Sequence, residues 1–417
     1  MLDALADEEP VIALHGPRSV GKSTVLRTFA ANRGVQVIDL DDLGTRDAVR
    51  ANPTLTASGA PPLCLDEYQH VPETLDAIKA RLNREGVRPG IAVLTGSTRQ
   101  DALPRTAQAL TGRLHSMIIW PLSQGELHLG HENFIECLRC DPDATVAALP
   151  ESSTTRGDYI QRIIAGGFPL AARRSPTGRD RWFDNYVKQS IEKDALELTR
   201  VRQRQVVGDL LGRLAGQTAQ VLNLSKVSDG LAVERKTVEE HVRLLEDLFL
   251  VTRLPAWGKT LRARATAKPK VHIVDSGLAA RLLRITPAKL DSLDPTALTE
   301  FGHLLETFVV GELRKQTSWL TESTATGHWR THDNDEVDFV IEFDDGSVLA
   351  FEVKSGERVA AGELRGLRKL REALGKQFVA GVALSTGVRS YTQEDRIHVV
   401  PVDRLWRPIS PEECPPR

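Results

Sequence analysis

Nine residues near the N-terminus have the types and spacing needed to hold the phosphates of a nucleotide. The stretch "GPRSVGKST" (16–24) matches the pattern G-x-x-x-x-G-K-[ST]. In this pattern the glycines let backbone N–H groups converge on phosphate oxygens, and the positive end of the following helix adds to the attraction. The lysine reaches the β- and γ-phosphates, and the hydroxyl contributes a ligand to Mg²⁺. The predicted nucleotide-binding residues here are Gly16, Gly21, Lys22, Ser23 and Thr24.

An acidic pair in "PLCLDEY" supplies the expected partner of this loop. Asp66 ends an apolar stretch and could hold Mg²⁺ through a water, while Glu67 is placed to polarise the attacking water. The alternative is a simple helix cap. In the following "LTGS", either Thr95 or Ser97 could sense the γ-phosphate; Ser97 is carried forward and the choice stays open. Arg113 is a candidate arginine finger acting on a neighbouring copy, against the alternative of a solvated surface residue.

A second set of charged residues falls in "EVDFVIEFDDGSVLAFEVK" (336–354). Alternate residues of a strand share a face, so Glu352 and Lys354 lie on the same side of it. The turn "DDGS" can bring Asp338 alongside. Two carboxylates could then share a divalent metal, predicted to be Mg²⁺ because the ligands are oxygens, and the lysine could orient a water. The alternative is a surface hairpin with solvated charges.

A helix upstream of this hairpin offers one more carboxylate. In "GHLLETFVVGEL" the candidate is Glu306, and Glu312 competes with it six residues later. Both alternatives stay open, because two glutamates on one predicted helix cannot be ranked without knowing which face meets the hairpin.

Basic residues are concentrated in the loop "GKTLRARATAKPK" and at the start of the helix before it. Such residues could contact nucleic-acid phosphates, giving affinity without sequence reading. The alternatives are a solubilising loop or a patch that docks on the acidic first domain. The predicted partner is DNA, branched or duplex. The candidate nucleic-acid-binding residues are Arg235, Lys236, Lys259, Arg262, Arg264, Lys268 and Lys270.

A metal-ligand spacing also occurs in "HLGHENFIECLRC". His128, His131, Cys137 and Cys140 follow H-x2-H-x5-C-x2-C, which could complete a tetrahedral Zn²⁺ site. A helix with two half-buried cysteines is the preferred interpretation, because the gap between the pairs is shorter than usual. Four cysteines in a chain of this length predict no disulfide framework.

The elements that must position these residues begin with an alternation of short apolar stretches and helices. Apolar runs occur at 11–15, 35–39, 61–67 and 91–97. Strands alternating with helices predict a parallel sheet covered by helices on both faces. The phosphate loop and the acidic pair then follow two of its strands.

The rest of the chain predicts three further parts. After an α/β nucleotide domain at 1–150, residues 151–218 read as mostly helical. At 219–290, helix, turn, helix and a two-stranded ribbon predict a winged helix. At 296–417 a long helix is followed by strands and a further helix, which predicts an α/β domain.

Bulk composition narrows the class of protein. The 417 residues are 26% charged with a net charge of −2, which excludes a wholly basic nucleic-acid coat. There is no run of 18 apolar residues, so no membrane helix or membrane partner is predicted. The start "MLDALADEEP" lacks a secretory signal pattern, so a cytoplasmic location is expected.

Residues 1–260 resemble AAA-type ATPases of bacteria and archaea that carry a C-terminal domain of unknown function. The resemblance rests on the phosphate loop, "LCLDEYQHVP", "LTGS", "LTGRLHSMIIWPLSQGEL", "GGFP" (166–169) and "YVKQSIEKD", and it continues through "LLEDLFLV", "VDSGL" and the tail. It implies ATP binding and hydrolysis, and homo-oligomers that could form a ring.

The tail resembles the PD-(D/E)XK nuclease fold, especially Holliday-junction resolvases. Asp338 matches the Asp of the motif, Glu352-Val353-Lys354 matches E-x-K, and Glu306 matches the glutamate of the first helix. Val337 departs from the motif, which has Pro there. The leading hypothesis is therefore ATP-dependent DNA processing by an ATPase coupled to a Mg²⁺-dependent nuclease-like domain. The alternatives are an ATP-switched DNA-binding or scaffold protein with an inactive nuclease fold, and a nucleotide switch without a nucleic-acid partner.

Overall fold

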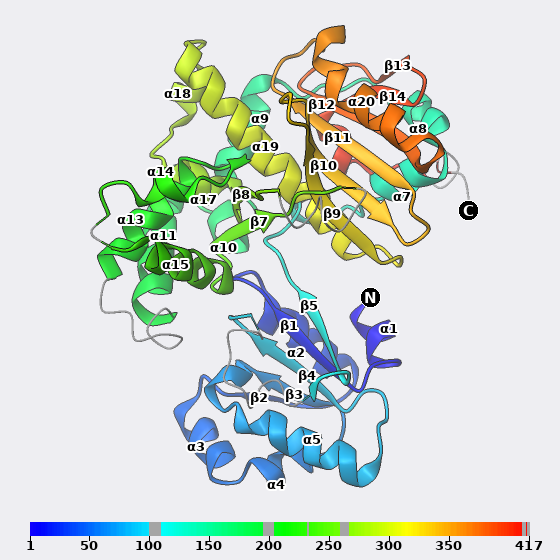
Figure 1. Cartoon of the computed structure of the whole chain (residues 1–417). Helices are drawn as coiled ribbons and strands as arrows, with labels where there is room; N and C mark the ends of the chain where they lie inside the picture. Colours follow the sequence, from blue (N-terminus) through cyan, green and yellow to red (C-terminus); the bar gives the residue numbers. More distant parts are fainter. Residues whose placement is uncertain (100–109, 195–203, 232, 259–266, 411–413, 415–417) are drawn as a thin grey trace. The chain divides into compact units, whose positions relative to one another are not determined.

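The structure is a computed structural model, and it describes residues 1–99, 110–194, 204–231, 233–258, 267–410 and 414 (Figure 1). The chain forms two compact units, each built from several stretches of sequence. The first unit comprises Met1–Pro121, Tyr186–Arg204 and Glu240–Leu250, and the second comprises Leu122–Asn185, Gln205–Glu239 and Val251–Arg417.

The first unit is built on a five-stranded parallel sheet in the order β2-β3-β4-β1-β5. This confirms the predicted parallel α/β sheet. The strands are β1 (Val11–His15), β2 (Val37–Asp39), β3 (Leu63–Asp66), β4 (Ala92–Gly96) and β5 (Leu114–Ile118). The helices are α1 (Leu2–Ala6), α2 (Lys22–Asn32), α3 (Leu43–Ala51), α4 (Pro53–Ala57), η1 (Tyr68–His70) and α5 (Glu73–Glu85).

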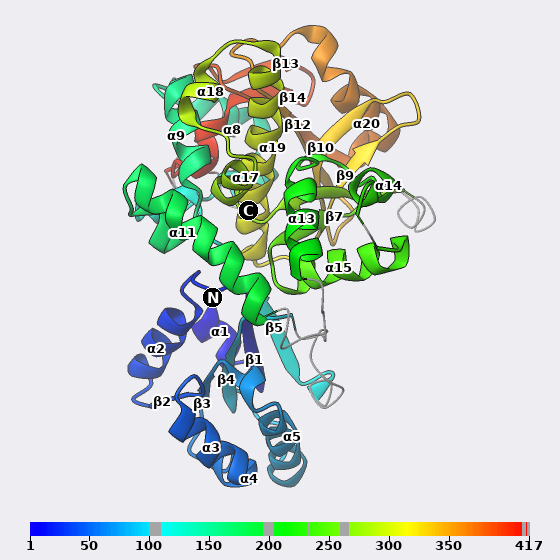
Figure 2. The same cartoon turned by 90° about the vertical axis from the view of Figure 1, so that its left-hand side faces the viewer.

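Alternating side chains of this sheet enter two separate cores. Val11 and Ala13 of β1 pack with residues of α5, whereas Ile12 and Leu14 pack with residues of α2. Figure 2 shows β1 and β4 between these two helices. Because both faces of β1, β3 and β4 are buried, these strands are apolar runs whose polar residues lie at their C-terminal ends.

The second unit begins with helices and a small antiparallel sheet in the order β6-β8-β7. The pairing of β7 with β8 confirms the predicted two-stranded ribbon. The helices before it are α6 (Gln124–Leu127), α7 (Phe134–Cys140), α8 (Pro142–Ala148), α9 (Arg156–Ala165), α10 (Pro169–Ala172) and α11 (Pro176–Gln189). From Tyr186 the chain belongs to the first unit, so the end of α11 and η4 (Ser190–Asp194) are part of that unit. The next elements are α13 (Arg204–Ala215), β6 (Gln220–Val221), α14 (Leu224–Ser228), α15 (Arg235–Asp247), β7 (Val251–Leu254), β8 (Lys270–Ile273), α17 (Ser276–Leu282) and α18 (Pro287–Asp291). The part of α15 from Glu240 onward belongs to the first unit.

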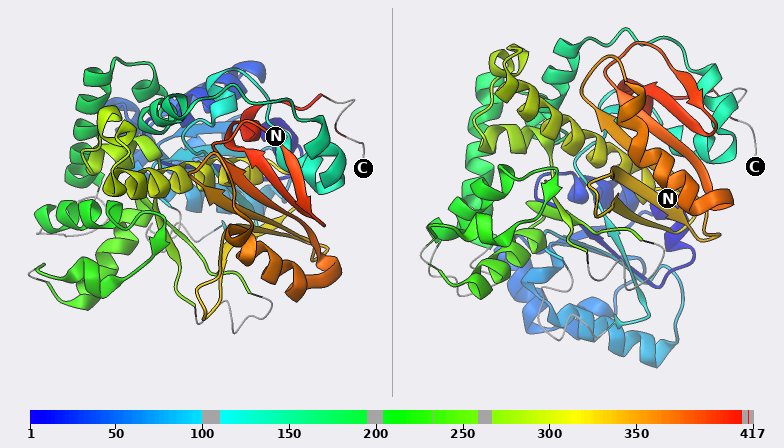
Figure 3. Two further views of the ribbon diagram at one scale, coloured as in Figure 1. Left: turned by 90° about the horizontal axis from the view of Figure 1, so that it is seen from above. Right: turned by 45° about the horizontal axis from the view of Figure 1, so that its top comes forward.

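A mixed six-stranded sheet in the order β13-β14-β12-β11-β10-β9 completes the second unit. Helix α20 lies over one face of it (Figure 3) and supplies Leu367, Leu370 and Leu374 to the core. The elements are α19 (Pro295–Ser318), β9 (Thr324–Arg330), β10 (Glu336–Phe343), β11 (Val348–Lys354), η5 (Ala361–Leu364), α20 (Arg365–Leu374), η6 (Gly375–Gln377), β12 (Phe378–Ser385), β13 (Tyr391–Glu394), β14 (Ile397–Pro401) and η7 (Val402–Trp406).

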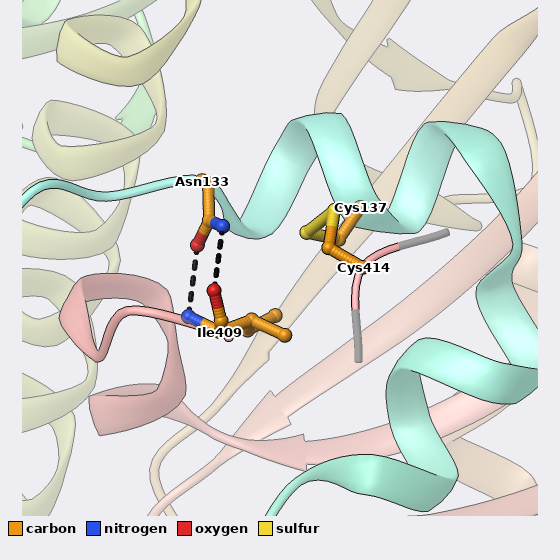
Figure 4. Close-up of a disulfide and its surroundings, with 4 residues drawn as sticks. All are labelled: Asn133, Cys137, Ile409 and Cys414. Carbon is orange, nitrogen blue, oxygen red and sulfur yellow. Dashed lines mark hydrogen bonds between the residues drawn. A yellow bond between two sulfur atoms is a disulfide. The ribbon is translucent and has the colours of Figure 1, made fainter. Parts of the chain in front are cut away.

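The zinc interpretation of "HLGHENFIECLRC" is wrong, because Cys137 forms a disulfide with Cys414 (Figure 4). A cysteine in a disulfide has no thiolate to offer a metal. Asn133 holds the same two segments together: its amide donates to the Ile409 carbonyl and accepts from the Ile409 N–H, each at 2.9 Å. Cys64 and Cys140 are free, so the four cysteines make one disulfide, which ties α7 to Cys414, and do not form a disulfide framework.

The short motifs "GGFP" and "VDSGL" form a single buried junction. Asp275 caps α17 by accepting from the Leu278 N–H at 2.9 Å, and its other oxygen accepts from the Gly167 N–H at 2.7 Å. A Cβ on Gly167 would lie 2.1 Å from the Leu122 carbonyl oxygen, so only glycine fits. These motifs therefore position the helices α9 and α17.

Replacing Asp275 with alanine is expected to lower the free energy of unfolding of the second unit by about 2 kcal/mol, because two buried N–H groups lose their acceptor. Urea unfolding followed by tryptophan fluorescence measures it. Asp344→Ala, in an exposed turn, is the matched control and should change stability by less than about 0.5 kcal/mol. Equal midpoints for the two variants would contradict the assigned role.

Among the described residues, no helix combines the length and the apolar character needed to cross a membrane.

Candidate functional site

The phosphate loop connects β1 to α2 and has a backbone that only glycine permits at its first position. Gly16 has φ 147°, and a Cβ there would lie 2.2 Å from the carbonyl oxygen of Ile119. Gly21, with φ 103°, is the N-cap of α2. The positive φ values turn successive N–H groups toward one concave side, where an anion can be held.

Lys22 is buried within this loop, with 4% of its surface exposed. Its ammonium donates to the carbonyl oxygens of Gly16 at 2.9 Å and Pro17 at 2.7 Å. The ammonium is therefore already held at the loop where the β- and γ-phosphates of a nucleotide would bind.

Two oxygens suited to Mg²⁺ meet next to the loop. Ser23 Oγ, at the start of α2, donates to Asp66 Oδ1 at 3.0 Å, and Asp66 ends β3 with 3% exposure. The Thr95 hydroxyl also donates to Asp66 Oδ1. A hydroxyl and a carboxylate beside a phosphate loop are the donors that Mg²⁺ prefers, so these residues fit the ion.

Glu67 follows Asp66 with a left-handed backbone, at φ 53°. Its N–H donates to Thr95 Oγ1 at 3.1 Å, and its carboxylate accepts from the Gln69 amide. The same amide donates to Ser97 Oγ at 3.1 Å. The two sensor candidates thus have different roles: Thr95 joins Asp66 to Glu67, whereas Ser97 lies beside Gln69 with its own O–H left to donate.

Two further predicted residues lie away from this cluster. Thr24 is exposed on α2. Arg113 precedes β5, and its guanidinium donates to the Asn83 side chain at 2.6 Å. Because β5 runs parallel to β1 with Ile118 opposite His15, Arg113 lies at the sheet edge opposite the phosphate loop.

The second unit brings a lysine into the middle of three carboxylates. The Lys270 ammonium lies 2.7 Å from Glu306 Oε1 and 2.7 Å from Asp338 Oδ1, and it also contacts Glu336. Glu306, Glu336 and Asp338 are called the carboxylate cluster below. The lysine side chain is 1% exposed and that of Asp338 is 7% exposed, so this ion pair is formed away from water, whereas Glu336 is 27% exposed.

The predicted E-x-K pair lies next to this cluster. β10 and β11 are antiparallel with Phe339 opposite Phe351, and Asp338 accepts from the Val353 N–H at 2.8 Å. Lys354 donates to Glu352 Oε1 at 2.8 Å, while Glu352 Oε2 is buried without a hydrogen-bond partner. The hairpin therefore brings together the residues predicted from strand spacing.

The charges in this region shift one another's pKa values. Burial alone would lower the pKa of Lys270, but Asp338, Glu306 and Glu336 outweigh it, and the pKa lies well above its ordinary value. Burial and the charge of Asp338 raise the pKa of Glu306 and of Glu352 well above the usual range. Burial raises the pKa of Asp338 too, yet Lys270 leaves it below its ordinary value. The pair Lys270–Asp338 is therefore ionised.

The structure distinguishes Glu306 from Glu312. Glu306 contacts Lys270 from α19. Glu312, 1% exposed, instead accepts from the Gln124 N–H at 2.7 Å and pairs with Lys315 at 2.7 Å. Glu312 thus anchors the segment that starts α6.

The predicted basic patch has to be corrected at Lys270. This lysine is buried among carboxylates and cannot reach a nucleic-acid phosphate. Arg235, Lys236 and Lys268 are exposed, whereas Lys259, Arg262 and Arg264 lie outside the described residues. Sequence reasoning did not place Lys270 or Glu336 in the cluster. Two signals were present: a charged residue opening the apolar strand "KVHIV", and the spacing of Glu336 two residues before Asp338.

Comparisons with family models identify the first part of the chain. Residues 8–128 match an AAA domain, so the chain carries an AAA-type ATPase domain, as the sequence predicted. Residues 156–289 and 301–405 match two domains of unknown function, DUF8612 and DUF4143. The match to DUF4143 does not name a nuclease.

Two relatives that match nearly the whole chain are described as uncharacterized proteins. The chain is 25% identical over 408 residues to the uncharacterized proteins Rv2008c of Mycobacterium tuberculosis and Mb2031c of Mycobacterium bovis, covering 97% of this chain and 82% of each relative. Among solved structures it is similar to the Walker-type ATPase PABY2304 of Pyrococcus abyssi, with 16% identity, a TM-score of 0.41, and coverage of 68% of this chain and 93% of that one. It is also similar to the RuvB Holliday junction branch migration motor of Thermotoga maritima, with 16% identity, a TM-score of 0.29, and coverage of 59% and 82%.

Proposed function

We propose that this AAA-type ATPase binds ATP with Mg²⁺, hydrolyses it, and uses the nucleotide cycle to control nucleic-acid binding by its second unit. The observation that carries the proposal is the meeting of Lys22, Ser23 and Asp66 at one loop. The phosphates, the ion and the attacking water need different groups, and this loop and the strand ends beside it supply all of them.

Each side chain of the site has one role in the proposed hydrolysis. Lys22 holds the β- and γ-phosphates, and Ser23 and Asp66 would hold Mg²⁺, which neutralises phosphate charge when bound. Glu67 orients the attacking water, and the Gln69 amide positions the Glu67 carboxylate. Ser97 is the better γ-phosphate sensor, because Thr95 already donates to Asp66.

The position of Arg113 supports homo-oligomers. Its guanidinium lies at the sheet edge opposite its own phosphate loop, so a role in hydrolysis requires a second copy. A ring is the closed arrangement in which each copy supplies this residue to the next.

The element order from α13 to β8 supports a winged helix in the second unit. Helix, strand, helix, helix and two strands follow one another, with the sheet order β6-β8-β7. In this interpretation α15 is the helix that approaches DNA, and the loop between β7 and β8 is the wing. Arg235 and Lys236 at the start of α15 and Lys268 before β8 are exposed and could bind phosphates.

The C-terminal sheet supports a nuclease-like fold in either of two roles. Convergence of Asp338, Glu352 and Lys354 on one hairpin favours metal-dependent cutting of DNA. The presence of Lys270 among the carboxylates favours the other role, a nuclease-like domain that binds or scaffolds without cutting. We adopt the second role, because the position expected for a metal cation is already occupied by the positively charged ammonium of Lys270.

Replacing Arg235 and Lys236 together with alanine is expected to weaken binding to duplex DNA and to lower the slope of log K against log salt by about two, one for each lost phosphate contact. Fluorescence anisotropy over a salt series, with and without ATP, measures both effects. Branched DNA, single-stranded DNA and RNA are compared in the same assay.

The matched control removes two exposed cations elsewhere in the second unit, Arg173→Ala with Lys376→Ala. It should leave the salt slope unchanged. Binding by the wild type that is absent, or flat across the salt series, would refute the nucleic-acid role and favour a nucleotide switch with a different partner. Binding that is identical with and without ATP would refute the coupling.

A further inference from the structure

We propose that the Lys270 ammonium is the built-in cation of the carboxylate cluster and excludes Mg²⁺ or Mn²⁺ from the nuclease-like domain. The residues present therefore do not fit the metal that the fold implies. The inference rests on the non-cutting role adopted above and deepens it, because it states which cation the domain holds, whether or not the chain binds nucleic acid.

The hydrogen-bonding capacity of the ammonium matches the cluster. An ammonium has three donors, and the three acceptors come from Glu306, Glu336 and Asp338. Among the described residues, these same three carboxylates are the one group of three or more acidic, histidine or cysteine side chains whose ligand atoms lie close enough to share a metal ion. The lysine thus fills the strongest candidate metal site in the part of the chain that the structure describes.

A divalent ion does not fit beside this lysine. Mg²⁺ binds carboxylate oxygens at about 2.0–2.1 Å in near-octahedral geometry. An ion bonded to oxygens that already lie 2.7 Å from Nζ would be pressed against the ammonium. Two like charges would then face each other in a site shielded from water, where their repulsion is least screened.

The lysine cannot leave the cluster in the way a surface side chain could. Lys270 opens β8 and pairs with Leu254 of β7 and Val221 of β6. Its side chain is 1% exposed. Moving the ammonium out would leave the buried Asp338 and the partly buried Glu306 without their cation, which is strongly unfavourable.

The neighbouring E-x-K pair is satisfied internally as well. Lys354 donates to Glu352 Oε1 at 2.8 Å, and Asp338 Oδ2 accepts from the Val353 N–H. Among the described residues, Glu352 Oε2 is one of the buried side-chain oxygens without a hydrogen-bond partner. It is the oxygen that could complete a metal site once Lys270 is removed, together with the freed oxygens of Glu306 and Asp338.

Replacing Lys270 with alanine is therefore expected to create a divalent metal site. Mn²⁺ binding to the full chain without nucleotide, measured by electron paramagnetic resonance of the free ion, should increase by about one ion per chain relative to wild type. Mn²⁺ should also raise the melting temperature of Lys270→Ala by a few degrees and leave that of the wild type unchanged. Lys268→Ala, two residues earlier and exposed, is the matched control.

A second variant locates the gained ion. Adding Asp338→Asn to Lys270→Ala should abolish the extra Mn²⁺, because one carboxylate ligand becomes a neutral amide. Persistence of the extra ion in this double variant, or failure of a folded Lys270→Ala protein to bind more Mn²⁺ than wild type, would overturn the proposal.

Measurements on the wild-type protein test the proposal even if the Lys270→Ala variant does not fold. Wild type and Asp338→Asn should bind equal amounts of Mn²⁺, and neither should cut plasmid, branched or single-stranded DNA in Mg²⁺ or Mn²⁺. Mn²⁺ binding or metal-dependent cleavage by the wild type that Asp338→Asn abolishes would overturn the proposal. Neither result affects ATP hydrolysis, so the ATPase part of the proposed function can fail separately, whereas the non-cutting role of the nuclease-like domain fails together with this inference.

Discussion

Replacing Lys22 with alanine should abolish ATP binding and hydrolysis. The ammonium is buried at the phosphate loop and donates to two carbonyl oxygens there, so it reaches the phosphates without a large movement. A hydrogen bond to a charged group contributes about 1.5–3 kcal/mol. Losing the two bonds from Lys22 to the β- and γ-phosphates would therefore weaken ATP binding by about 100-fold or more. Titration with a fluorescent ATP analogue measures the affinity, and phosphate release measures the rate.

The matched control for this prediction is Lys79→Ala on α5, a fully solvated lysine in the same unit. It should bind and hydrolyse ATP as the wild type does. A Lys22→Ala protein that folds and binds ATP within about threefold of wild type would contradict the phosphate-loop assignment, because that difference is less than one hydrogen bond to a charged group.

Replacing Glu67 with glutamine should separate binding from hydrolysis. The substitution keeps the size of the side chain and an oxygen that can accept from the Gln69 amide, but it removes the negative charge that polarises water. General-base groups contribute about 10²–10⁴-fold to rates, so steady-state hydrolysis should fall by that factor while ATP affinity changes little. Phosphate release in excess ATP, together with equilibrium binding of the analogue, measures the two quantities.

Glu73→Gln, at the exposed start of α5, removes the same charge away from the loop and should leave hydrolysis unchanged. If Glu67→Gln retained hydrolysis within a few-fold of wild type, another group would have to activate the water. If ATP affinity fell together with the rate, Glu67 would instead act in nucleotide binding. The first outcome would change the residue assigned to water activation, and the second would change the role assigned to Glu67.

The nucleotide site could be predicted almost completely from sequence, because most of its parts are local. The glycines, Lys22 and Ser23 lie within one short loop, and Asp66 and Glu67 are adjacent. Parallel strands bring their C-terminal ends to one edge of a sheet, so order along the chain already implies proximity. The order along the chain could not predict the different contacts of Thr95 and Ser97. They depend on which of the two hydroxyls donates to Asp66, and only the packing of β3 against β4 decides that.

The composition and patterning of the sequence by themselves determined the parallel sheet, the phosphate loop, the hairpin and the pairing of Glu352 with Lys354. These follow from periodicities and contacts between near neighbours. Only the tertiary structure decided that Lys270, 68 residues before Asp338, enters the carboxylate cluster, and that Cys137 pairs with Cys414, 277 residues away. A buried charge is compensated by whichever residue the packing brings to it, and at such separations no local pattern specifies the partner.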